Sequence, residues 1–200
     1  MKKAVVNGVI AVAVMFARAH SSHAQSLQGL HIGEDKSALA KLGVPETIEK
    51  YKSYVVQKWT LASGNALSAT VNSEGKIVYL ESDWNGSADA TGSDLDGLRF
   101  GATSLADLRR RFGSNGFRFK GRGGVLRTSD GVVMINSYDT STAVVTFFTK
   151  VPSGASQSSN STPVAARAKL DALSIADADY AKSEWGERIY DPNYKKPEWK

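Results

Sequence analysis

The 200-residue sequence contains no cysteine, which excludes a disulfide framework and a lipid-bearing cysteine after the apolar start of the chain. Histidine is almost as scarce, because His31 is the only one beyond residue 24. Zinc and copper are held by clustered histidine, cysteine or carboxylate side chains, so neither metal is expected. The sequence also lacks an apolar run long enough to span a bilayer. We therefore expect no metal, no other cofactor and no membrane-spanning helix.

Residues 1–24 have the pattern of a cleaved signal peptide. Basic Lys2 and Lys3 precede a mostly apolar run from Ala4 to Ala17, and Ser22-His23-Ala24 resembles a small-x-small cleavage site. The run is too short to cross a membrane, although a retained N-terminal anchor is the alternative. Cleavage after Ala24 would place the mature chain in the periplasm or outside the cell. The segment carries three basic residues and no acidic residue, so its loss lowers the net charge from +5 to +2. The basic pI is therefore weak evidence for nucleic-acid binding, which we do not expect.

One short motif occurs twice, 68 residues apart. The sequence LQGLHIG at 27–33 returns as LDGLRFG at 95–101. A fixed spacing of this kind indicates an internal repeat. The first repeat is assigned to residues 25–84, a polar linker to 85–93 and the second repeat to 94–151.

Each copy is followed by a short helix and then by strands. The helices are predicted over 36–42, capped by Asp35, and over 104–112, and Gly43 and Gly113 are placed at their ends. Alternating apolar residues predict strands over 54–61, 66–71 and 76–84, and later over 132–138 and 143–149. A further helical turn is suggested over 46–51. These patterns predict an α+β fold of two tandem modules, each with short helices packed on a small antiparallel sheet.

The remaining residues are predicted to form a linker and a helical tail. Residues 152–163 are rich in serine and are expected to be disordered. Residues 164–200 are interpreted as a helical, aromatic tail, because Ser174 and Asp177 resemble a capping box and Ile175, Ala181 and Trp185 follow a helical period.

The repeat resembles a module found in known envelope proteins. In the first copy, Gly33, Leu42-Gly43-Val44-Pro45, Trp59 and Gly75-Lys76-Ile77-Val78 carry the resemblance, and in the second Gly101-Ala102-Thr103 and Phe112-Gly113 carry it. This pattern is similar to the module shared by β-lactamase inhibitory protein and the SmpA/OmlA outer-membrane lipoproteins. The resemblance implies an α+β fold and a binding role in the envelope. The Gly-Met-Thr usual in that family is replaced in both copies, and no contact residue is transferred from it.

The sequence offers no catalytic residues. His31 is replaced by Arg99 in the second copy, and no nucleophile or orienting group is assigned to it. We therefore expect that the protein is not an enzyme.

Nine residues are candidates for binding a partner. Tyr54, Trp59 and Tyr79 are large side chains on strands that have apolar residues on both faces, and Trp185 and Trp199 are anchor-type residues of the tail. The basic candidates are Arg109, Arg110, Arg111 and Arg118, which favour an anionic partner such as an acidic protein loop, lipopolysaccharide or phospholipid headgroups. The alternatives are a solvated helix face for the arginines and packing within the chain for the aromatic residues.

These observations predict a non-enzymatic, exported module that binds another protein in the envelope or outside the cell. Inhibition of an envelope or secreted enzyme is one form of this function. The alternative is a structural or assembly factor of the bacterial outer membrane or envelope.

Overall fold

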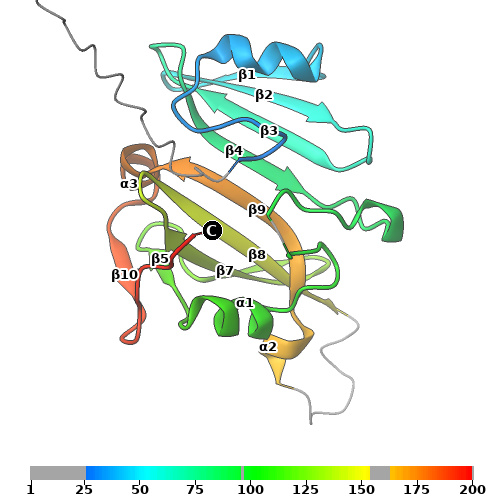
Figure 1. Ribbon diagram of the computed structural model, residues 1–200, viewed down its shortest axis with the longest axis vertical. Coiled ribbons are helices and arrows are strands. Elements are labelled where there is room, and N and C mark those ends of the chain that lie inside the picture. The colour runs from blue at the N-terminus through cyan, green and yellow to red at the C-terminus, as the bar shows by residue number, and fades with distance from the viewer. Residues whose placement is uncertain (1–25, 96, 154–162, 200) are drawn as a thin grey trace, which may run out of the picture.

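A single antiparallel sheet of ten strands organises the chain in the computed structural model, which describes residues 26–95, 97–153 and 163–199 (Figure 1). The strand order is β1-β2-β3-β4-β9-β8-β7-β5-β10, and β6 pairs with β7. The signal-peptide prediction for residues 1–24 and most of the predicted linker 152–163 lie outside the described residues.

The strands and helices have the following bounds. The strands are β1 Thr47–Tyr51, β2 Tyr54–Thr60, β3 Ala66–Val71, β4 Ile77–Asp83, β5 Phe117–Phe119, β6 Val125–Thr128, β7 Gly131–Asp139, β8 Ala143–Pro152, β9 Lys169–Asp177 and β10 Arg188–Tyr190. The helices are η1 Lys36–Leu42, η2 Ala88–Ala90, α1 Leu105–Phe112, α2 Val164–Arg167 and α3 Ala178–Trp185, of which η1 and η2 are 3-10 helices. In the part of the chain that the structure describes, no helix is long and apolar enough to cross a membrane.

The predicted fold class is wrong, because strands from both repeats belong to one continuous sheet. The strand that joins them is β9, which pairs with β4 on one side and with β8 on the other. This strand comes from the segment that the sequence predicted to be a helical tail. Ser174 lies inside β9, and Asp177 instead caps α3 by accepting hydrogen bonds from the amides of Asp179 and Tyr180.

The burial of β9 explains why its sequence was misinterpreted. Five consecutive residues, from Ala172 to Ala176, are buried, so both faces of the strand are covered and the apolar–polar alternation of a half-buried strand is missing. A short apolar run of this kind cannot be distinguished from a buried helix by periodicity alone. Pairing with two neighbouring strands then overrides the helical preference of its alanine and leucine residues.

The sequence repeat has a structural counterpart that explains the position of β9. The amide of Gly33 donates a hydrogen bond to the carbonyl of Ile77 at the start of β4, at 2.8 Å. The amide of Gly101 donates one to the carbonyl of Leu170 in β9, also at 2.8 Å. The second copy of the motif is therefore joined to β9 as the first is joined to β4, and these two strands lie next to each other at the centre of the sheet.

The main core lies against one face of the sheet. It contains the leucines of both repeated motifs, and Leu27, Leu30, Leu95 and Leu98 are all buried. Figure 1 places η1 near β1 and α1 near β7, with the C-terminal end of the chain between them. The opposite face carries a second cluster in which α3 packs against Phe119 and Val144 through Ala181. The two faces of the sheet thus have separate coverings, and these decide which of the candidate residues are exposed.

Candidate binding site

Helix α1 positions the three consecutive arginines predicted from the sequence. Its start is defined by a capping box, in which Ser104 accepts a hydrogen bond from the amide of Asp107 and the Asp107 side chain accepts one from the amide of Ser104. Leu105 and Leu108 are buried, and Gly113 ends the helix in the left-handed conformation, at φ 70°. The arginines occupy the last turn, where the negative end of the helix dipole favours cations.

The three arginines of α1 diverge into two separate concavities. Successive residues of an α-helix point about 100° apart, so three consecutive side chains cannot all share one direction. Arg109 lines a cleft on one side of the helix together with Arg118, and Arg110 and Arg111 line a groove elsewhere. The four candidate arginines therefore form two pairs.

The groove that contains Arg110 and Arg111 is here called the cationic groove. It has a volume of about 550 Å³, and its other wall is the C-terminal segment from Lys195 to Trp199. Four cationic side chains line it against one carboxylate. These are Arg110, Arg111, Lys195 and Lys196, and the carboxylate is Glu198. The groove therefore has a positive potential that favours an anionic ligand.

Aromatic rings form part of the lining of the cationic groove. The rings of Phe112 and Trp199 lie with their centroids 5.0 Å apart, and the guanidinium of Arg111 lies 5.7 Å from the centre of the Phe112 ring. Arg110 forms an exposed ion pair with Asp107, at 3.1 Å. An exposed pair of this kind is weak in water, so Arg110 can exchange Asp107 for an incoming carboxylate at little cost.

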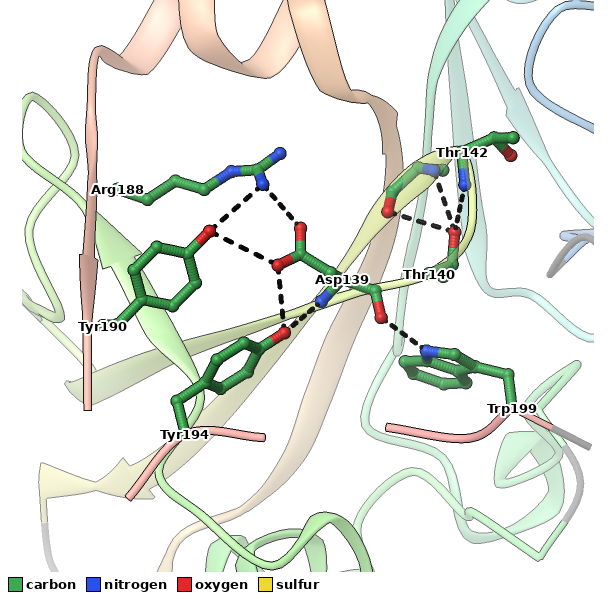
Figure 2. A network of polar contacts seen from close by, with 8 residues as sticks. Asp139, Thr140, Thr142, Arg188, Tyr190, Tyr194 and Trp199 are labelled. Carbon is green, nitrogen blue, oxygen red and sulfur yellow. Dashed lines mark hydrogen bonds and ion pairs between the residues drawn. The ribbon is translucent and has the colours of Figure 1, made fainter. Parts of the chain in front are cut away.

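The C-terminal wall of the groove is fastened to the turn between β7 and β8 (Figure 2). The indole nitrogen of Trp199 donates to the carbonyl of Asp139 at 2.7 Å. The hydroxyl of Tyr194 donates to the Asp139 carboxylate at 3.0 Å and accepts from the Asp139 amide at 2.9 Å. Arg188 forms an ion pair with the same carboxylate at 2.7 Å. These contacts hold Trp199 within the chain, as the alternative interpretation of the tail expected.

The protonation of Tyr194 suits its role in this network. Burial raises the pKa of Tyr194 far above its usual value, and the negative charge of Asp139 raises it further. The hydroxyl therefore keeps its proton at physiological pH and continues to donate to the carboxylate.

Tyr54, Tyr79 and Trp185 come together on the opposite face of the sheet, around α3. The ring of Tyr180 on α3 lies 5.1 Å from Tyr54 and 5.9 Å from Tyr79, and the ring of Trp185 lies 5.8 Å from Tyr79. The guanidinium of Arg122 lies 4.3 Å from the centre of the Trp185 ring. These aromatic residues mostly contact one another, so the structure accounts for them by packing within the chain.

Two further polar contacts hold this aromatic cluster. The Tyr79 hydroxyl donates to the Glu81 carboxylate, and Arg122 lies 4.0 Å from the same carboxylate. Burial raises the pKa of Tyr79 well above its usual value, and the neighbouring charge of Glu81 adds to the shift. Tyr79 is therefore a neutral donor within the fold.

The interpretation of Trp59 as a contact residue is corrected by its burial. Its side chain is 4% exposed, and its indole nitrogen donates to the carbonyl of Gly43 at 3.2 Å. Trp59 thus fastens the end of η1 to the sheet and belongs to the core. The predicted cap of η1 is confirmed, because Asp35 accepts a hydrogen bond from the amide of Ser37.

Sequence reasoning missed Lys195 and Lys196, and it did not include Arg122 among the nine candidates. The lysine pair stands close to Trp199 in the sequence, and a basic pair beside an aromatic residue is a signal that could have identified it. Arg122 lies in a glycine-rich turn, which the sequence indicates only as a turn. Its position over Trp185 depends on the chain folding back across the sheet.

Comparison with known proteins gives distant structural likenesses. The sequence matches no protein-family model and no curated protein. The structure of this chain is similar to the crystal structure of the DUF4309 family protein YjgB from Bacillus subtilis. The sequence identity is 14% and the TM-score is 0.44, over 75% of this chain and 83% of that one. It is also similar to an extracellular protein with an SCP domain from Bacillus anthracis, at 12% identity and a TM-score of 0.43, over 98% of this chain and 56% of that one. Neither likeness bears on function, so the resemblance to β-lactamase inhibitory protein and the SmpA/OmlA module stays a prediction.

Proposed function

We propose that the chain is an exported, non-enzymatic binding protein that takes an acidic segment of another protein in the cationic groove. The observation that carries this proposal is the convergence of two basic segments, Arg110-Arg111 and Lys195-Lys196, beside the rings of Phe112 and Trp199. A ligand with carboxylates and apolar side chains complements both features. Cleavage after Ala24 would deliver the protein to the periplasm or beyond the cell, where its partner would reside.

The residues of the groove suit recognition rather than acid–base chemistry. Arg110 and Arg111 offer positive charges and planar hydrogen-bond donors and no acceptor. Their fork of N–H groups matches a carboxylate in two-point contact. Inhibition of a secreted or envelope enzyme is one outcome that such binding could have.

The test measures the binding of a short, fluorescein-labelled peptide rich in glutamate and leucine, by fluorescence anisotropy with the full chain. We expect saturable binding that weakens as the salt concentration rises from about 0.05 to 0.5 M, because salt screens exposed charges. A peptide with glutamine in place of every glutamate should bind much more weakly.

A matched pair of double variants assigns the binding to the groove. Arg110→Gln with Arg111→Gln should weaken binding by about tenfold to thirtyfold, since two exposed charge contacts of up to about 1 kcal/mol each multiply to this factor. Lys120→Gln with Arg127→Gln removes the same charge from exposed positions elsewhere and should leave binding nearly unchanged. Equal losses in both double variants would refute the assignment.

The alternative function, a structural or assembly factor of the outer membrane or envelope, gives a different result. In that case the chain would bind vesicles that contain phosphatidylglycerol, would depend on Arg110 and Arg111 for this binding, and would not bind the acidic peptide. Binding to vesicles without binding to the peptide would replace the proposal.

A further inference from the structure

A second concavity lies between α1 and the outer strands of the sheet, and it is here called the sheet-floor cleft. It has a volume of about 290 Å³. Strand register places Val125 of β6 opposite Met134 of β7, and Ile189 of β10 opposite Arg118 of β5. These four side chains line the cleft. No lining residue is shared with the cationic groove, so the two concavities are separate sites.

Three of the large apolar side chains that line the cleft are exposed. Val125 is 59% exposed, Tyr190 46% and Ile189 43%. Scattered exposed apolar residues need no explanation, but a group of them in one concavity indicates a binding site.

The two arginines that line the cleft are poorly paired within the chain. The Nε atom of Arg109 is buried and has no hydrogen-bond partner among the described residues. Arg118 is exposed, and no ion pair joins it to the parts of the chain that the structure describes. A buried N–H group without an acceptor is unfavourable, so contacts within the chain leave the guanidinium of Arg109 poorly compensated.

The one carboxylate of the cleft is already engaged in holding the chain together. Asp191 accepts a hydrogen bond from the side-chain amide of Asn115 at 2.5 Å and one from the amide of Asn193 at 2.8 Å. The cleft is lined by the guanidinium groups of Arg109 and Arg118 and by this one carboxylate, so its lining has a net charge of +1. A ligand with a single negative charge matches that net charge better than a doubly charged phosphate does.

We propose that the sheet-floor cleft binds a small organic carboxylate with an apolar tail. The carboxylate would lie between Arg109 and Arg118, whose planar groups suit two-point contact with it. The tail would cover Val125, Met134 and Ile189. This inference goes beyond the proposed function, because it concerns a different ligand at a different site.

Met134 provides a direct reporter for this binding. The chain contains three methionines, Met1, Met15 and Met134, so methyl-labelled methionine gives few NMR signals. The variant Met134→Leu assigns the signal from the cleft. Octanoate, 1-octanol and inorganic phosphate are then titrated into the full chain, which separates the contributions of charge and tail.

We expect octanoate to shift the Met134 signal in a saturable way and phosphate to cause no shift. 1-Octanol should bind at least about tenfold more weakly than octanoate, because one charge-assisted contact is worth about a factor of ten. Arg118→Gln should weaken octanoate binding by about tenfold. Arg127→Gln, a matched loss of charge on the neighbouring β6, should leave it unchanged.

Three outcomes would overturn the proposal. They are equal binding of 1-octanol and octanoate, equal effects of Arg118→Gln and Arg127→Gln, or no saturable shift of the Met134 signal. A circular dichroism spectrum of ligand-free Arg118→Gln that matches the spectrum of the unaltered chain shows that this variant is folded. Binding of the acidic peptide should be insensitive to octanoate, so failure at the cleft and failure at the cationic groove can be distinguished.

Discussion

Gly33 and Gly101 occupy equivalent positions in the repeated motif, yet they should respond differently to the same substitution. Both have positive φ angles, of 87° and 68°. A β-carbon at Gly101 would lie 2.4 Å from Cη2 of Trp84, with two more ring atoms within 2.9 Å. A β-carbon at Gly33 would meet nothing within 4 Å. Alanine at either position therefore tests the same backbone strain, with a steric clash at only one of them.

The expected magnitudes follow from these contacts. Alanine in the left-handed region costs about 1–2 kcal/mol relative to glycine, and both variants should lose this amount of stability. Overpacking adds about 1–3 kcal/mol for Gly101→Ala. The Trp84 ring cannot move away freely, because its nitrogen donates to the carbonyl of Ser87 at 2.9 Å. We therefore expect a loss of about 1–2 kcal/mol for Gly33→Ala and about 2–5 kcal/mol for Gly101→Ala.

Urea unfolding followed by circular dichroism measures both losses under the same conditions. A double variant, Gly101→Ala with Trp84→Ala, removes the ring that causes the clash. Its loss of stability should be smaller than the sum of the two single losses by about 1 kcal/mol or more. Equal losses for Gly33→Ala and Gly101→Ala, or full additivity in the double variant, would refute the reasoning.

Two further predictions concern titration and the C-terminal segment. Burial, and then the charges of Glu81 and Asp171, raise the pKa of Asp83 from 3.8 to about 7, so the folded chain binds this proton more tightly and loses stability as the pH rises through that interval. Asp83→Asn should therefore raise the urea midpoint at pH 8 and leave it nearly unchanged at pH 4, and equal shifts at both pH values would contradict this. Tyr194→Phe removes two hydrogen bonds to Asp139 and should reduce the free energy of unfolding by about 1–3 kcal/mol, measured in the same way. An unchanged midpoint would show that these bonds contribute nothing to holding the segment.

Local sequence patterns predicted the elements whose signals are confined to a few neighbouring residues. The hairpin of β3 and β4 has alternating side chains on either side of Asn72-Ser73-Glu74-Gly75, and the structure contains both strands. Helix α1 ends at Gly113 as predicted. The prediction of a helical turn over 46–51 was wrong, because these residues pair with β2 as the edge strand β1. A lone edge strand is defined by its partner rather than by its own composition.

In the candidate sites, too, the sequence predicted contacts between neighbouring residues but not contacts between distant segments. The sequence alone determined that Arg110 and Arg111 would be close together on one short helix, because the spacing of a helix is local. It also determined the two repeated turns, because their glycines allow the positive φ angles that the turns require.

Only the tertiary structure decided that β9 would join the two halves of the sheet and that Lys195 and Lys196 would face the arginines of α1. These arrangements bring together segments many tens of residues apart. They depend on which surfaces can be buried at the same time across the whole chain. That condition is set by the packing of the entire core and not by the pattern of any single segment.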